Sequence, residues 1–177
     1  MHQPPPAAAP LIAPSRRGLL KLGALGLAGL GTTLLAAAAV KGFSHGVASG
    51  EPGPDRVLLW TRFAAAADAV LQWQVSDTAD FARTVAAGDV TASPANDCCA
   101  KAWAWGLTPG QWYFYRFIAP SGEMSPIGRT KTLPVGKVSR FRIAVFSCSN
   151  YGFGWFNAYA HAAEAGDFDL ALHLGDY

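Results

Sequence analysis

The feature that most constrains the fold is a change of sequence pattern at Pro134-Val135-Gly136. Before this point, short runs of β-prone residues alternate with turn signals, which predicts an antiparallel β-sandwich. After it come an apolar run, an alanine-rich stretch with helical propensity and a second apolar run. A strand, a helix and a strand in close succession predict a βαβ unit with parallel strands. We therefore expect an all-β sandwich followed by the start of an α/β domain.

The sandwich is expected to span residues 43–134. Its clearest strand contains Leu71, Trp73 and Val75, which alternate with polar residues as in a half-buried strand. Further strands are expected at residues 57–61, 84–91, 112–115 and 127–133, with a break at Gly88-Asp89 in the second of them.

A turn leads into the aromatic strand of the sandwich. The pattern L-x-P-G-x-x-Y at residues 107–113 resembles the tyrosine corner of fibronectin type III domains. That resemblance implies a hydrogen bond between the hydroxyl of Tyr113 and a nearby backbone group. The alternative is an ordinary strand entry with surface aromatic side chains.

The sandwich carries no recognisable catalytic constellation. His45 stands alone, which favours a structural hydrogen bond over metal binding. Cys98 and Cys99 are adjacent and would point to opposite faces of a strand, so two free thiols are expected rather than a strained vicinal disulfide. The six tryptophans suggest carbohydrate binding, but the alternation of Trp103 and Trp105 with alanines favours core positions.

Charge and cysteine spacing give no support to a nucleic-acid-binding surface or a zinc site. The formal net charge is +2, so no strong positive field favours a nucleic-acid-binding surface. The three cysteines form no CxxC pair and no Cys/His cluster at zinc-binding spacing.

Residues 1–42 have the organisation of an export signal. Arg16 and Arg17 precede a weakly apolar stretch at residues 22–40, which ends in small residues. The pattern S-R-R-x-[FL]-L-K resembles the twin-arginine (Tat) signal, which implies export by the Tat translocase and a periplasmic or extracellular location.

Two alternatives to a Tat signal remain open. One is an ordinary Sec signal that contains two arginines. The other is an uncleaved anchor, which would make the chain a membrane-anchored structural protein. The glycines of the apolar stretch disfavour a stable helix by up to about 1 kcal/mol each, so no stable membrane anchor is expected.

Cys148 and Asp176 are the candidate metal ligands. Cys148 follows the apolar run at residues 141–146, and Asp176 follows the run at residues 170–174. Parallel neighbouring strands bring such positions together at one sheet edge, where ligands collect in open α/β sheets. The alternatives are a buried, apolar role for Cys148 and a strand-end cap for Asp176.

Three segments together resemble one known family. They are "FSHGVASGEPGPDRVLLWTR", "SPIGRTKTL" and "FRIAVFSCSNYGFGWFNAY…DLALHLGDY". These segments, in this order and behind a Tat-type signal, are similar to the alkaline phosphatase D (PhoD-type) family of secreted metallophosphoesterases. The resemblance implies a β-sandwich domain at residues 43–134. It also implies the start of a calcineurin-like metallophosphatase domain at residues 139–177.

The resemblance also implies a chemistry. Family members are described as holding iron and calcium and as hydrolysing phosphate mono- and diesters with a metal-activated water. Ser147-Cys148 matches the family's Ser-Cys stretch, which stands where related enzymes carry Asp-x-His. Asp176 matches the bridging aspartate of the family's GDY motif, while the catalytic acid or base is not identifiable.

The family pattern continues beyond GDY with a further tyrosine and with Asp, Asn and His ligands. The chain is therefore expected to be a truncated, N-terminal portion of such an enzyme, inactive alone and without stoichiometric iron or calcium. His161 is expected to be exposed on the helix. His173 is expected to point sideways in its strand, with support of a metal ligand as the alternative. The competing function is an exported, non-catalytic β-sandwich binding module.

The twin arginines generate a test of the export route. We predict that the double variant Arg16→Lys, Arg17→Lys leaves the precursor in the cytoplasm, because the Tat translocase recognises the arginine pair. Cell fractionation measures the distribution, with Lys21→Arg as a control that keeps the charge of the segment. Normal export of the double variant would point to the Sec route.

Overall fold

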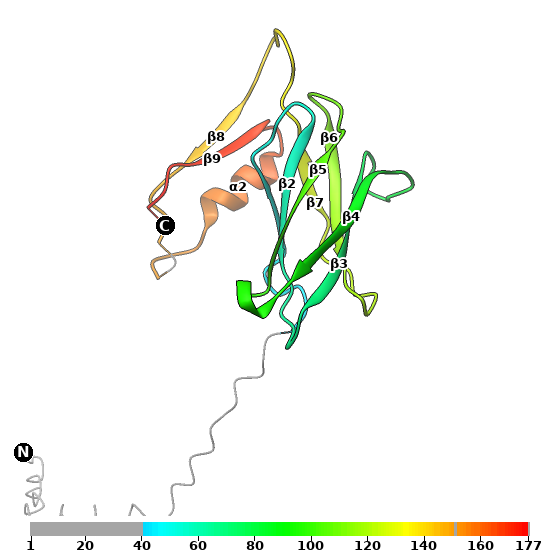
Figure 1. Ribbon diagram of the computed structural model, residues 1–177. Coiled ribbons are helices and arrows are strands. Elements are labelled where there is room, and N and C mark those ends of the chain that lie inside the picture. The colour runs from blue at the N-terminus through cyan, green and yellow to red at the C-terminus, as the bar shows by residue number, and fades with distance from the viewer. Residues whose placement is uncertain (1–40, 151, 177) are drawn as a thin grey trace, which may run out of the picture. The chain divides into compact units, whose positions relative to one another are not determined.

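The computed structural model describes residues 41–150 and 152–176 (Figure 1). Arg16, Arg17 and nearly all of the expected signal therefore lie outside the described residues. Within the described residues, no helix is both long and apolar enough to cross a membrane. The contacts group residues 40–177 into a single unit.

Seven antiparallel strands form two sheets in the first part of this unit (Figure 1). One sheet has the order β1-β2-β5 and the other the order β4-β3-β6-β7. The chain is mostly β, as predicted, whereas the exact domain boundaries stay a prediction. The strands are β1 (Val47–Gly50), β2 (Arg56–Arg62), β3 (Ala69–Ser76), β4 (Thr84–Ala92), β5 (Cys99–Trp105), β6 (Trp112–Ile118) and β7 (Gly128–Lys131), with a short 3-10 helix (Pro94–Asn96) before β5.

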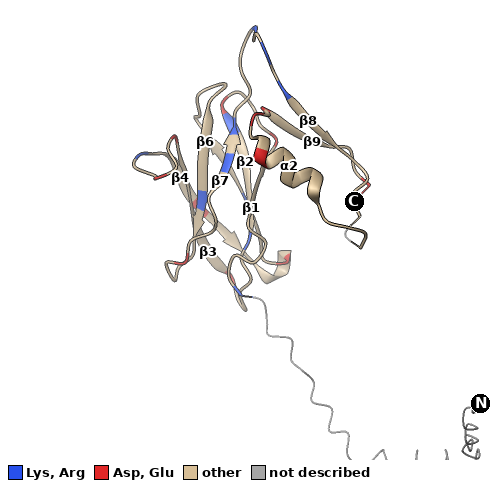
Figure 2. Cartoon of the chain, turned by 180° about the vertical axis from the view of Figure 1, so that it is seen from behind, with Lys and Arg blue, Asp and Glu red and all other residues tan. Residues whose placement is uncertain are grey.

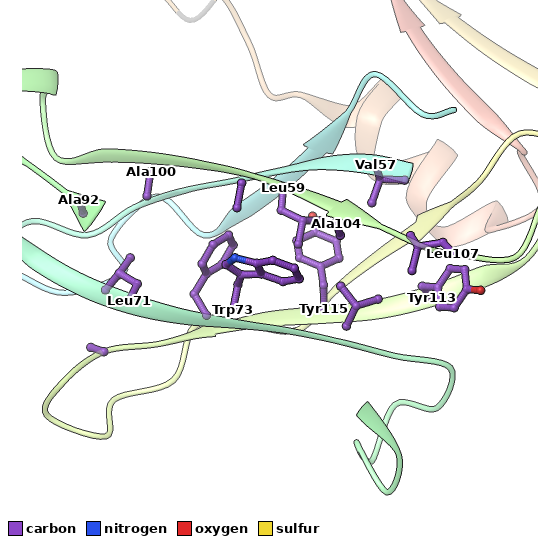
Figure 3. Packing of buried hydrophobic residues seen from close by; sticks show 14 of the residues in the cluster. Val57, Leu59, Leu71, Trp73, Ala92, Ala100, Ala104, Leu107, Tyr113 and Tyr115 are labelled. Carbon is purple, nitrogen blue, oxygen red and sulfur yellow. The ribbon is translucent and has the colours of Figure 1, made fainter. Parts of the chain in front are cut away.

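The core between the two sheets combines aromatic rings from one sheet with smaller, aliphatic side chains from the other (Figure 3). Strands β3 and β6 contribute Trp73, Tyr115 and Phe117, which are all buried. Strand β5 contributes three buried alanines, at positions 100, 102 and 104, which leave room for the large rings.

In β5 the alanines therefore face the core and the tryptophans face outward, which is the opposite of the prediction. Trp103 and Trp105 lie on the outer face and are 37% and 54% exposed, so the expectation of core positions was wrong. The Arg56 side chain lies over both rings, with its guanidinium carbon 5.6 Å and 4.8 Å from the ring centroids. The facing sheet already fills the core with aromatic rings, and the cation–π contacts partly cover the tryptophans.

Gly88 does not break its strand, which also corrects a prediction. It lies within the continuous strand β4 and pairs with Trp73 of β3. A Cβ atom at position 88 would lie 2.7 Å from the Trp73 ring, so glycine is required to make room for the indole.

The tyrosine corner is confirmed. The backbone N–H of Thr108 donates a hydrogen bond of 2.8 Å to the hydroxyl of Tyr113, which is buried. The prediction of free thiols is confirmed as well, since Cys98 is buried, Cys99 is half-buried and neither is in a disulfide. His45 makes a local 2.7 Å hydrogen bond with Ser44.

The second part of the unit is the predicted βαβ unit. It consists of β8 (Ile143–Phe146), α2 (Asn157–Ala165) and β9 (Leu170–His173). The two strands are parallel, with Ile143 opposite Leu170 and Phe146 opposite His173. Gly166 ends the helix in the left-handed conformation that glycine adopts without strain.

Candidate functional site

The backbone ladder of β8 and β9 continues past the ends of both strands. The N–H of Leu174 donates to the carbonyl of Phe146 at 2.9 Å. The N–H of Cys148 then donates to the carbonyl of Gly175 at 3.2 Å. The turn after β8 and the turn after β9 are thereby joined next to Asp176, so the predicted proximity of the two turns is observed.

Both candidate ligands have a left-handed backbone conformation. The φ angles are +56° at Cys148 and +62° at Asp176. A left-handed conformation costs a residue with a Cβ atom roughly 1–2 kcal/mol. Four other non-glycine residues also have positive φ angles, namely Glu51, Phe81, Asp97 and Cys98. The distinguishing feature of Cys148 and Asp176 is therefore that their two turns are joined by a backbone hydrogen bond.

The Cys148 side chain is exposed, so the alternative of a buried, apolar role is wrong. It lines a hollow of about 440 Å³. The hollow combines polar groups of the turn after β8 with aromatic side chains from the segment before α2. Its lining includes Ser147, Cys148, Ser149, Asn150, Phe153, Trp155 and Phe156. Asp176 is also exposed, at the neighbouring turn.

A chain of hydrogen bonds runs behind these two turns. The Tyr159 hydroxyl is hydrogen-bonded to Ser149 Oγ on one side and lies 2.7 Å from His173 Nε2 on the other. The Gly175 N–H donates to His173 Nδ1 at 3.0 Å. Sequence reasoning missed Tyr159 and Ser149, because nothing in the helical pattern marks one tyrosine as a partner of two strand ends. His161 on the same helix is exposed, as predicted.

The donor chemistry of the site fits part of a metal centre. A thiolate and a carboxylate are both common metal ligands, and their turns are joined by a backbone hydrogen bond. Among residues 41–150 and 152–176, however, no group of three or more His, Cys, Asp or Glu side chains could hold a metal ion. Cys148 and Asp176 therefore fit as two members of a larger ligand set.

Asp169 connects the βαβ unit to the sandwich. Its carboxylate pairs with Lys131 of β7 and accepts a 2.7 Å hydrogen bond from the N–H of Arg142. The Lys131 ammonium and the Arg142 N–H together hold the pKa of Asp169 below its usual value. Arg129 of β7 donates to the carbonyl of Gly166 at 3.0 Å, and Figure 2 shows the basic residues of β7 beside the end of α2.

A larger hollow of about 680 Å³ lies at this junction, between α2, β9 and strands β1 and β7. Neither Cys148 nor Asp176 lines it. The larger hollow is therefore separate from the candidate ligands, which lie at the strand ends.

Two family models match the chain. The model described as PhoD-like phosphatase, N-terminal domain, matches residues 31–134, and the model described as PhoD-like phosphatase matches residues 143–177. The chain belongs to the PhoD-like phosphatase family. Cys148 and Asp176 both lie in the part that the second model matches.

Two proteins of known name are similar to this chain in sequence or in structure. It is 39% identical over 146 residues to alkaline phosphatase D of Bacillus subtilis, covering 76% of this chain and 25% of that protein. A solved structure described as the structure of PhoD has a TM-score of 0.74 and 37% identity, covering 78% of this chain and 28% of the other. The chain thus spans about a quarter of the length of the PhoD-like proteins that it matches.

The Asp169 contacts generate a prediction about stability. Replacing Asp169 with Asn removes the charge that Lys131 and the Arg142 N–H stabilise, and should lower the free energy of unfolding by about 1–2 kcal/mol. A lowered folded-state pKa contributes stability above the unfolded value of about 3.9 and loses it as the pH falls through the folded value. The difference between wild type and Asp169→Asn should therefore be constant from about pH 5 to 8 and shrink below about pH 4.

The matched control is Asp167→Asn, at an acidic residue two positions away. Asp167 forms ion pairs with Arg140 and Arg142, and its side chain is 46% exposed, compared with 17% for Asp169. Such exposed pairs contribute at most about 1 kcal/mol, so this variant should change stability less. Denaturant unfolding as a function of pH measures both. An equal effect of the two substitutions would contradict the anchoring role of Asp169.

Proposed function

We propose that this chain provides the N-terminal portion of the active site of a secreted, metal-dependent phosphoesterase. In this proposal Cys148 and Asp176 bind metal, and phosphate mono- or diesters are the substrates. Membership of a phosphatase family supports the reaction class. The observation that carries the proposal is the pair of left-handed turns joined through the Cys148 N–H and the Gly175 carbonyl.

The residues of the chain have distinct tasks in this proposal. Cys148 presents a thiolate from the turn after β8, at the rim of the hollow. Asp176 presents carboxylate oxygens, which are able to bridge two cations. Bound metal ions supply electrostatic stabilisation of the charge that develops on the phosphoryl oxygens. Both turns are fixed by the backbone of β8 and β9, so the ligands are held by a sheet edge rather than by a mobile loop.

We further propose iron and calcium as the metals. A thiolate suits iron, whereas calcium prefers oxygen ligands such as carboxylates. Two ligands leave most coordination positions of either ion to water. We therefore expect the isolated 177-residue chain to bind neither ion stoichiometrically and to show no hydrolysis, since the remaining ligands would have to come from outside the described residues.

Export belongs to the proposal as well. The pattern at Arg16 and Arg17 supports transport by the Tat translocase to the periplasm or the cell exterior. The Tat route carries folded proteins, which agrees with a metal centre that is assembled before export.

The alternative of a non-catalytic binding module draws support from the exposed Trp103 and Trp105 on the outer face of β5. This alternative gives the βαβ unit no function. The match of a phosphatase model to residues 143–177 and the hydrogen bond that joins the turns of Cys148 and Asp176 favour the catalytic proposal.

The test is a hybrid protein. Residues 1–177 of this chain are followed by the portion of Bacillus subtilis alkaline phosphatase D that the chain does not cover. We predict that the hybrid hydrolyses a nitrophenyl phosphate ester and that the 177-residue chain does not. Asp176→Asn in the hybrid should lower kcat by roughly 100-fold or more, because even residues that only support a metal ligand are worth 10- to 100-fold.

The control in the hybrid is Asp167→Asn, which removes a carboxylate of the same unit away from the strand ends and should leave kcat unchanged. Hydrolysis that survives Asp176→Asn would overturn the proposed role of Asp176. Hydrolysis by the 177-residue chain alone, sensitive to Asp176→Asn, would contradict the claim that this chain holds only part of the site.

A further inference from the structure

Tyr159 lies at the centre of an aromatic cluster that no candidate ligand belongs to. Its ring packs edge-on against Phe146 of β8, with centroids 4.9 Å apart, and stacks with Phe156 at 5.6 Å. The His173 ring of β9 is 6.0 Å away. These contacts fix the ring between both strands and the start of α2, so its hydroxyl has a defined position beneath the two turns.

The hydrogen bonds around this hydroxyl have a single consistent direction. The Gly175 N–H donates to His173 Nδ1, so Nδ1 carries no proton. In a neutral imidazole the proton is then on Nε2, which donates to the Tyr159 oxygen at 2.7 Å. The Tyr159 hydroxyl is free to donate in turn to Ser149 Oγ. Gly175, His173 and Tyr159 thus each donate a hydrogen bond to the next residue, and this series of bonds leads from the turn after β9 to Ser149 in the turn after β8.

The two residues at the ends of this hydrogen-bond series are the sequence neighbours of the candidate ligands. Gly175 directly precedes Asp176, and Ser149 directly follows Cys148. Two strained residues need neighbours that hold them in place, since the left-handed conformation is not their preferred one. The backbone bond from Cys148 to Gly175 joins the turns directly, and the hydrogen bonds through Tyr159 join them a second time, through side chains.

We propose that Tyr159 is a positioning residue that locks the two metal-binding turns together through His173 and Ser149. The inference rests on the proposed function for the identity of Cys148 and Asp176 as ligands. Hydrogen-bonded groups behind metal ligands orient those ligands and tune their affinity, and this chain of bonds has that arrangement. Tyr159 itself touches neither substrate nor metal in this account.

The first test uses the metal-free 177-residue chain and needs no substitution. Nitrogen NMR of the imidazole rings reports which nitrogen carries the proton. We expect the neutral form of the His173 ring to be the Nε2–H tautomer with an unprotonated Nδ1. An Nδ1–H tautomer at His173 would overturn the proposal, because the bond from Gly175 would then be impossible.

The second test measures amide hydrogen exchange in the same chain. Tyr159→Phe keeps the ring and removes only the hydroxyl, and should speed exchange of the Cys148 and Gly175 amides by at least about tenfold. Amides of β3 and β6 should be unaffected. Ser149→Ala should accelerate the Cys148 amide, and Ser149→Thr, which keeps a hydroxyl, should restore protection. His161→Gln, on the exposed side of the same helix, is the matched control and should change nothing.

Unchanged exchange at Cys148 and Gly175 in Tyr159→Phe would overturn the proposal. So would equal behaviour of Ser149→Ala and Ser149→Thr, because the effect would then not depend on the hydroxyl. Both measurements are made without metal or substrate. If the hybrid enzyme lacks hydrolysis while the exchange results hold, the proposed function fails and the positioning role of Tyr159 stands.

Discussion

The parallel pairing of β8 with β9 is the constraint on which the site depends. Its register sets Phe146 opposite His173, and the ladder then continues beyond both strands to join Cys148 with Gly175. A shift by one residue would turn every side chain to the other face of the sheet. The candidate ligands therefore owe their proximity to backbone hydrogen bonds and not to an attraction between their side chains.

The two-stranded sheet of β8 and β9 depends on the sandwich for support. Two parallel strands and one helix bury little surface, and Ile143, Val145 and Leu172 remain 47%, 57% and 45% exposed. The contacts of Asp169 with Lys131 and the Arg142 N–H attach the beginning of β8 and β9 to the sandwich. The sandwich, with a core of its own, thus supports the end of the βαβ unit opposite the candidate site.

Sequence patterns predicted most of the architecture, because both parts obey simple periodicities. The bounds of α2, the parallel strands and the tyrosine corner at Tyr113 all followed from local signals. The orientation of Trp103 and Trp105 did not, because alternation alone cannot say which face of a strand is inside. That choice depends on the rings that β3 and β6 already place in the core. Gly88 was misread for a related reason, since its partner Trp73 lies on another strand.

The candidate site was predictable only in part. The ends of two apolar strands pointed to Cys148 and Asp176, and their resemblance to a family motif gave them a role. The bonds of Tyr159 with Ser149 and His173 depend on how α2 lies across the sheet. No pattern within the helix records that packing.

X-ray absorption at the iron edge of the hybrid enzyme tests whether Cys148 binds iron. We expect a sulfur ligand to iron that disappears in Cys148→Ser and persists in the control Cys99→Ser, which replaces a free cysteine of the sandwich. Iron bound at full occupancy with the same sulfur ligand in Cys148→Ser, or with no sulfur ligand in the unsubstituted hybrid, would contradict it.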